Sequence, residues 1–90
     1  MVYGVGALAR AKAGHDKEQV FLIIREDHEY VILADGISRT LGKPKHKREK
    51  HIQIIHDEGE PKRRKQIEET GLTDEAVKQM LQCYKRKGQL

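Results

Sequence analysis

The sequence has few of the residues that form disulfides, zinc sites and aromatic cores. Its 90 residues include one cysteine, Cys83, no tryptophan, one phenylalanine and three tyrosines. A single cysteine excludes an internal disulfide framework and a cysteine-based structural zinc site. We therefore expect a reducing, cytoplasmic setting and one small, mostly aliphatic core.

Long apolar runs are also absent. No stretch approaches the roughly 20 apolar residues that span a bilayer, and the first residues lack a basic segment followed by a long apolar run. We expect neither a transmembrane helix nor a signal peptide, and no membrane partner.

Charge is abundant and unevenly distributed. Charged residues make up 36% of the chain, and the formal net charge is +4. Residues 39–50, "RTLGKPKHKREK", hold six basic residues against one acid, and "KRRK" at 62–65 adds four more. Clustered basic residues indicate a polyanionic partner.

The first half of the chain carries strand signals. In residues 6–12 small and polar residues alternate, which is a weak strand signal. "QVFLIIR" at 19–25 is a run of strand length that is rich in β-branched residues. In this run Val20 and Leu22 share one face while Phe21 takes the other, so both faces should be covered. This pattern predicts a closed sheet, or a sheet with a helix across it.

Three more strands are predicted before residue 56. "YVILA" at 30–34, the Asp35-Gly36 turn and "ISRTL" at 37–41 indicate a tight hairpin, and "HIQII" at 51–55 a further strand. Gly42 and Pro44 favour irregular structure in residues 42–50. Five short strands are enough for a small, mainly β, five-stranded barrel over residues 1–58.

The end of the chain has strong helix signals over residues 73–88. Thr73 is a predicted N-cap, acidic residues follow it, and three basic residues precede Gly88. The apolar stripe of this helix, which should pack on the barrel or on a partner, comprises Ala76, Val77, Met80, Leu81 and Tyr84. Residues 59–72 are predicted to be an exposed basic linker, with a helical turn in 62–70 as the alternative, because in 62–70 the bases precede the acids and oppose the helix dipole.

Nothing in the sequence assembles a catalytic or metal site. No nucleophile stands with a base, and Cys83 borders the apolar stripe as a small core residue would. His46, His51 and His56 are five residues apart, so neighbours in the series point to opposite faces of a strand. We expect a non-enzymatic protein without a metal or cofactor.

The basic segments favour RNA. Residues 39–50 should stand on a rigid platform close to Arg10, Lys12 and Lys17, which is the electrostatic pattern of nucleic-acid binding. Aromatic residues that would stack on bases are scarce, so phosphates and the shape of structured RNA are the expected targets. The alternative is a protein-interaction module that uses the helical stripe.

Roughly residues 4–56 resemble a known family. "AKAGHDKEQVFLII", and "YVILADG" followed by "KPKHKREKHI", look like a KOW-motif domain. The chain is similar to bacterial KOW-domain RNA-binding proteins that resemble the fourteenth large-subunit ribosomal protein of archaea and eukaryotes. The resemblance implies a five-stranded SH3-like barrel whose loop, here Gly14, His15, Asp16 and Lys17, contacts ribosomal RNA. Glu18 departs from the family, which often has glycine there.

From these arguments we expect a ribosome-associated RNA-binding protein that is monomeric when free, with ribosomal proteins or assembly factors as further partners. The predicted RNA-binding residues are Arg10, Lys12, Gly14, His15, Lys17, Arg39, Lys43, Lys45, Lys47, Arg48, Lys50, Arg63 and Arg64.

Overall fold

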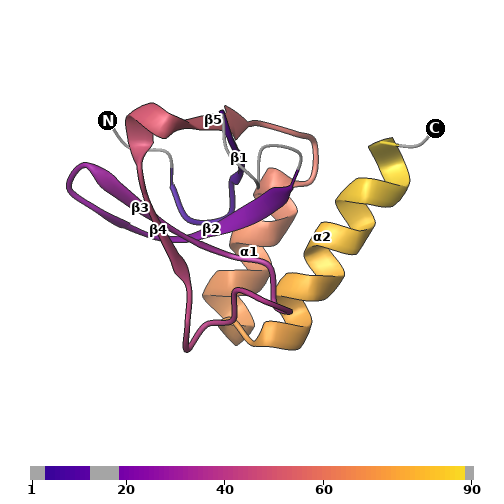
Figure 1. Cartoon of the computed structure of the whole chain (residues 1–90). Helices are drawn as coiled ribbons and strands as arrows, with labels where there is room; N and C mark the ends of the chain where they lie inside the picture. The colour runs from indigo at the N-terminus through magenta and orange to yellow at the C-terminus, as the bar shows by residue number, and fades with distance from the viewer. Residues whose placement is uncertain (1–3, 13–18, 89–90) are drawn as a thin grey trace.

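The computed structural model describes residues 4–12 and 19–88, in which five antiparallel strands form one sheet and two helices lie on one side of it (Figure 1). The strands are β1 (Leu8–Ala11), β2 (Val20–Asp27), β3 (Tyr30–Ala34), β4 (Lys45–Arg48) and β5 (Ile52–Ile55). The helices are α1 (Glu60–Thr70) and α2 (Asp74–Gly88), and a short 3-10 helix, η1 (Glu49–His51), joins β4 to β5. The fold is mainly β, as expected, with one helix more than the sequence predicted.

The core lies on both faces of β2, the central strand in the order β4-β3-β2-β1-β5. Phe21 and Ile23 point to one face and Leu22 to the other, as the alternation of a strand requires. The first cluster, away from the helices, contains Ala7, Ala9, Phe21, Ile23, Val31, Leu33 and Ile52. The second, on the helix side, contains Leu8, Val20, Leu22, Ala34, Val77, Met80 and Leu81. The prediction that both faces of this strand are covered is therefore confirmed.

The sheet is not closed into a barrel, so this part of the prediction was wrong. Among the described residues β4 pairs with β3 and β5 with β1, and no ladder joins β4 to β5. Only the three residues of η1 separate these strands, and the four steps from Arg48 to Ile52 reach at most about 14 Å, so the sheet must curl until its edges approach there. The four residues of β4 are lysine, histidine and arginine, which oppose edge-to-edge pairing.

Residues 37–41 do not form the expected strand, because the Asp35 carboxylate folds them into a loop. Asp35 is 6% exposed. It accepts hydrogen bonds from the N–H groups of Ile37 and Arg39, the Ser38 hydroxyl and the Gln19 amide, at 2.6–3.0 Å. Backbone groups that a strand would pair are thus used inside the loop.

The strand on the outer side of β3 comes from the basic segment instead. Lys45 and Lys47 of β4 lie opposite Leu33 and Val31 of β3, where we expected irregular structure. The tight hairpin joins β2 to β3, at a turn in which His28 has a φ of 54°. The prediction of a hairpin at Asp35-Gly36 was therefore wrong, and the tight hairpin of the structure is the preceding connection, between β2 and β3.

Residues 60–70 form α1, which corrects the prediction of an exposed linker over 59–72. Pro61 stands in the first turn, where its missing N–H leaves no hydrogen bond unmade. Gly71 ends the helix with a φ of 75°, and its N–H donates to the Ile67 carbonyl oxygen at 2.8 Å. Both ends of α1 therefore carry ordinary helix signals.

Arg63 ties α1 to the rest of the protein. Its side chain is 7% exposed, and its Nε donates to the Gly6 carbonyl oxygen at 2.8 Å. Its guanidinium forms an ion pair with Asp57 through two hydrogen bonds. The charge order in α1, which opposes the helix dipole, destabilises the helix by about 0.3–1 kcal/mol. Breaking a buried ion pair by removing one partner costs more, about 3–5 kcal/mol. Tertiary contacts therefore decide in favour of the helix.

The predicted C-terminal helix is confirmed. Thr73 caps α2, because its Oγ1 accepts a hydrogen bond from the Ala76 N–H at 3.1 Å. Asp74 accepts another from the Leu41 N–H at 2.7 Å. A Cβ at Gly36 would lie 2.4 Å from the Asp74 carbonyl oxygen, so the loop after β3 packs closely on this helix. The residues of α2 that are buried against the sheet are Val77, Met80 and Leu81.

Replacing Arg63 should destabilise the fold far more than replacing an exposed arginine. Arg63→Met leaves Asp57 without its partner and should cost about 3–5 kcal/mol, whereas Arg86→Met should cost less than about 0.5 kcal/mol. Adding Asp57→Asn to Arg63→Met should recover part of the loss, because no unpaired charge remains. Urea unfolding followed by circular dichroism measures all three, and equal midpoints for the two single variants would contradict the role of Arg63.

Stability should fall in acid because of two aspartates. The hydrogen bonds from Arg63 hold the pKa of Asp57 below its ordinary value of 3.8, although burial opposes them. Burial alone would raise the pKa of Asp35, but its hydrogen bonds from Arg39, Ile37, Ser38 and Gln19 outweigh burial and lower the pKa. Each contribution is complete above the unfolded-state pKa and is lost as the pH falls through the lower folded-state pKa.

Urea midpoints measured between about pH 5 and pH 2 test this. The protein should lose stability steadily over this range, and Asp35→Asn combined with Asp57→Asn should make the loss shallower. Asp27→Asn, at an aspartate whose side chain is 62% exposed, is the control. The same steep loss in the double variant and the control would show that other groups govern acid unfolding.

Candidate nucleic-acid interface

Basic side chains line the open edge of the sheet along the loop before β4, along β4 itself and along η1. We call them the β4 ridge, which consists of Lys43, Lys45, Lys47, Arg48 and Lys50. The strand geometry puts Lys45 and Lys47 on the same face, about 6.6 Å apart along the chain. Because β4 is hydrogen-bonded to β3 along its length, these cations stand on a fixed backbone.

Two lysines of the β4 ridge are partly structural. Lys45 and Lys47 are half-buried and lie opposite core residues of β3. The Lys45 ammonium nitrogen is 5.7 Å from the centre of the Phe21 ring. The aliphatic stems therefore cover the edge of the first core cluster, while the ammonium groups remain near water.

Arg48 forms an exposed pair with an aromatic ring. Its guanidinium carbon lies 5.2 Å from the centre of the Tyr30 ring, on the neighbouring strand, and Tyr30 is 38% exposed. The Glu29 carboxylate is 3.5 Å from the same guanidinium, between two largely exposed side chains. The sequence reasoning did not single out Tyr30. Its position directly after the hairpin turn, opposite an arginine in register, is the signal that could have found it.

Lys12 joins the β4 ridge through the β1–β5 ladder. The Lys12 N–H donates to the His51 carbonyl oxygen at 2.9 Å, which places Lys12 beside the end of η1. Lys50 is the residue before His51 in the same short helix. Lys12, Lys50 and His51 are all exposed. Arg10 is half-buried between Val20 and Gln53, and its Nε has no hydrogen-bond partner among the described residues.

Three predicted arginines lie away from this surface. Arg63 is buried in its ion pair with Asp57, so it is not available to RNA. Arg64 is paired with Glu60 at 2.6 Å on α1. Arg39 is exposed in the loop after β3, on the side that packs against α2.

The predicted loop residues Gly14, His15 and Lys17, with Glu18, lie outside the described residues. The chain is described on both sides of this segment, at Lys12 and Gln19. Their assignment to RNA contact stays a prediction.

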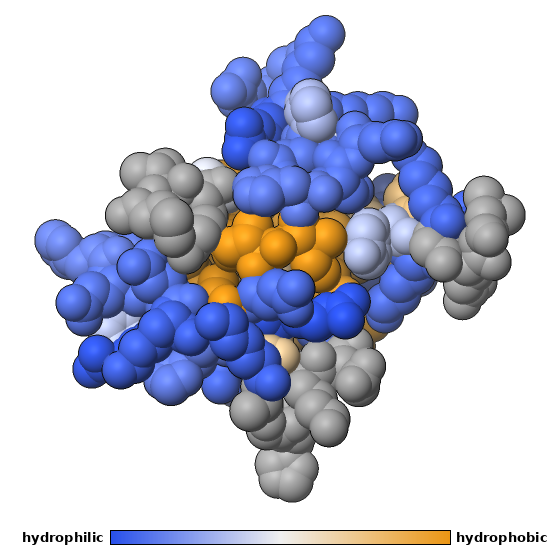
Figure 2. Space-filling view, turned by 90° about the horizontal axis from the view of Figure 1, so that it is seen from above, coloured by the Kyte–Doolittle hydropathy of each residue, from blue (hydrophilic) through white to orange (hydrophobic). Residues whose placement is uncertain are grey.

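The face that carries β1, β5 and η1 combines a polar rim with an apolar centre. Seen from above the view of Figure 1, hydrophilic residues surround a central apolar area (Figure 2). A polyanion on this face would contact the rim first.

Comparisons with known proteins do not assign a family. No protein-family model matches the sequence, and no curated protein matches it significantly. In the part of the chain that the structure describes, neither helix has the length and apolar character to cross a membrane. Within residues 4–12 and 19–88 no three histidine, cysteine or acidic side chains gather in a way that would hold a metal ion.

Two neighbouring lysines should differ in their effect on stability. Lys45→Ala removes a stem and a cation from above Phe21 and should cost about 0.5–1 kcal/mol, whereas Lys43→Ala, at an exposed loop position, should change stability by less than about 0.5 kcal/mol. Thermal unfolding of the two variants makes the comparison. If Lys43→Ala is the more damaging change, the packing of the β4 ridge is not as described.

Proposed function

We propose that the chain is a non-enzymatic RNA-binding protein of the KOW type, which binds structured RNA through the β4 ridge and Lys12. The observation that carries this proposal is the juxtaposition of Lys12 with η1, because it adds a cation from the residue after β1 to the five on the β4 ridge. A backbone hydrogen bond thus brings cations from distant parts of the sequence close together beside η1. Clustered cations neutralise several phosphates at once.

The spacing of the cations supports a nucleic-acid strand as the partner. Alternate residues of an extended strand are about 6.6 Å apart, comparable to successive phosphates along a nucleic-acid backbone. Lys45 and Lys47 hold this spacing because their stems are packed. Exposed lysines at both ends of the β4 ridge can adjust to the bound strand.

The surface favours phosphate and shape recognition over base-by-base reading. Among the described residues, Tyr30 is the one aromatic residue that is exposed, and Arg48 already lies against its ring. Readers of single strands use several exposed aromatic side chains. Structured RNA, with ribosomal RNA as the family resemblance implies, is therefore the proposed ligand, and the ribosome and the cytoplasm are the proposed location.

The test is a salt series with a variant that weakens the surface but spares the core. Lys12, Lys43 and Lys50 are exposed, so replacing all three with glutamine should leave the fold intact. RNA affinity should fall, and the slope of log affinity against log salt should decrease by about 2–3. Fluorescence polarisation with a labelled RNA hairpin, at several salt concentrations, measures both.

A second triple variant provides the matched control. Lys65, Lys85 and Arg86, exposed on α1 and α2, are replaced with glutamine, which removes the same total charge. RNA affinity and its salt slope should change little in this variant. Equal effects of the two triple variants would show that net charge, and not the β4 ridge, governs binding.

A further inference from the structure

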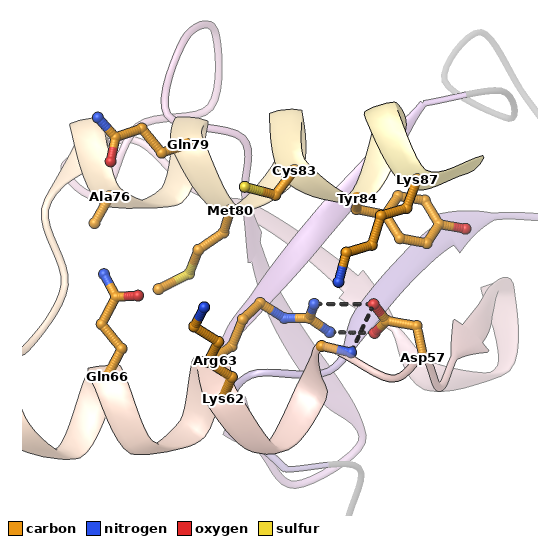
Figure 3. A pocket seen from close by; sticks show the side chains of 11 residues that line it. Asp57, Lys62, Arg63, Gln66, Ala76, Gln79, Met80, Cys83, Tyr84 and Lys87 are labelled. Atoms are coloured by element: carbon orange, nitrogen blue, oxygen red, sulfur yellow. Dashed lines mark hydrogen bonds and ion pairs between the residues drawn. The ribbon is translucent and has the colours of Figure 1, made fainter. Parts of the chain in front are cut away.

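A groove of about 260 Å³ runs between α1 and α2, on a surface that the proposed RNA-binding residues do not include. Figure 3 shows side chains entering it from both helices, with the ion pair of Arg63 and Asp57 at one end. It is lined by Asp57, Gly59, Lys62, Arg63, Gln66, Ala76, Gln79, Met80, Cys83, Tyr84 and Lys87. Two helices of the same chain thus present a ready-made concave surface.

The groove has an excess of positive charge. Asp57 is its one acidic lining residue, and Arg63 already neutralises that carboxylate. Lys62 from α1 and Lys87 from α2 point into the space between the helices (Figure 3), and neither forms an ion pair with a described residue. Two ammonium groups that face the same space repel each other, so an anionic group between them would be stabilised.

The middle of the groove is apolar and adaptable. Met80 lies at its centre in Figure 3, and the half-buried ring of Tyr84 lines it further along α2. Methionine adjusts its shape to different apolar partners. Gln66 points from α1 toward α2, and its amide can both donate to and accept from a peptide backbone.

We propose that this groove binds a short acidic segment of a partner protein. One large apolar side chain of that segment packs on Met80 and Tyr84, and its carboxylates pair with Lys62 and Lys87. An acidic peptide complements this groove better than a nucleic acid, because a peptide supplies both an apolar side chain for Met80 and Tyr84 and a few carboxylates for the two lysines. Helix-lined grooves with an apolar centre bind peptides through such anchors.

Alkylation of Cys83 can measure whether the groove is occupied. It is the one cysteine of the chain, it is exposed, and it lines the groove. A bound peptide should shield its thiol from alkylation by iodoacetamide, a neutral reagent whose approach does not depend on the charge of the lysines. The alkylation rate, followed by mass spectrometry, therefore reports occupancy of the groove.

The probe is an acetylated and amidated pentapeptide with leucine between two pairs of glutamates. It should slow alkylation of Cys83 in a saturable manner. Two matched peptides, one with glycine in place of leucine and one with lysines in place of glutamates, should protect much less. Equal protection by all three peptides, or protection by none, would overturn the proposal.

Two double lysine variants test whether the acidic peptide binds in the groove. Replacing Lys62 and Lys87 with glutamine should weaken binding of the acidic peptide roughly 2- to 30-fold, as expected for two exposed ion pairs. Lys65→Gln with Lys85→Gln, one lysine from each helix but outside the groove, should change it little. Equal weakening by both double variants would place the peptide elsewhere.

Further measurements test whether RNA or a second copy of the chain occupies the groove in place of the peptide. The triple glutamine variant at Lys12, Lys43 and Lys50 should still be protected by the acidic peptide, even where it has lost RNA affinity. Protection of Cys83 by an RNA hairpin but not by the peptide would assign the groove to RNA and overturn the proposal. Alkylation that slows with protein concentration alone would make a second copy of the chain the occupant, and would also overturn it.

Discussion

The arrangement of the helices depends on the ion pair between Arg63 and Asp57. α1 has Ile67 as its one large apolar residue, so hydrophobic burial alone gives it little hold on the sheet. Arg63 supplies that hold, because it reaches both Asp57 and the carbonyl oxygen of Gly6 at the start of the chain. With α1 fixed in this way, the helix face of the sheet is covered and a groove is left between the two helices. One guanidinium therefore connects the sheet, the helix pair and the second proposed binding surface.

The side chains of β4 have two structural roles, protecting the open edge of the sheet and covering the first core cluster. An open sheet needs an edge that resists pairing with other chains, and alternating lysine, histidine and arginine provide it. The first core cluster needs cover at that edge, and the stems of Lys45 and Lys47 provide it. The cations that remain at the surface are those that the proposed function assigns to RNA. Under the proposed function, one set of side chains on this strand therefore both protects the edge and binds RNA.

The parts of the fold that could be predicted from the sequence are those governed by local signals. The run around Phe21 is apolar on both faces, and the helix after Thr73 has a cap, a favourable charge distribution and an apolar stripe. The errors have two different causes, an adjacent carboxylate in one case and a tertiary contact in the other. The Asp35 carboxylate folds the loop that should have been a strand, and Arg63 stabilises a helix that the dipole disfavours. For the candidate site, the sequence predicted the β4 ridge residues and placed residues 39–50 close to Lys12, and the structure adds the contact itself, from the Lys12 N–H to the His51 carbonyl oxygen.

The two proposed surfaces show why the arrangement of charges carries more information than the net charge of +4. Along β4 the cations repeat on an extended backbone, so their combined effect grows with the number of phosphates they meet. Between the helices two lysines face one apolar centre, so specificity there must come from an apolar anchor with acids beside it. A nucleic acid has no single large apolar side chain to place on Met80, and a five-residue peptide is too short to follow the whole β4 ridge. Each proposed surface therefore discriminates against the ligand of the other by shape, because both ligands are anionic and charge alone does not separate them.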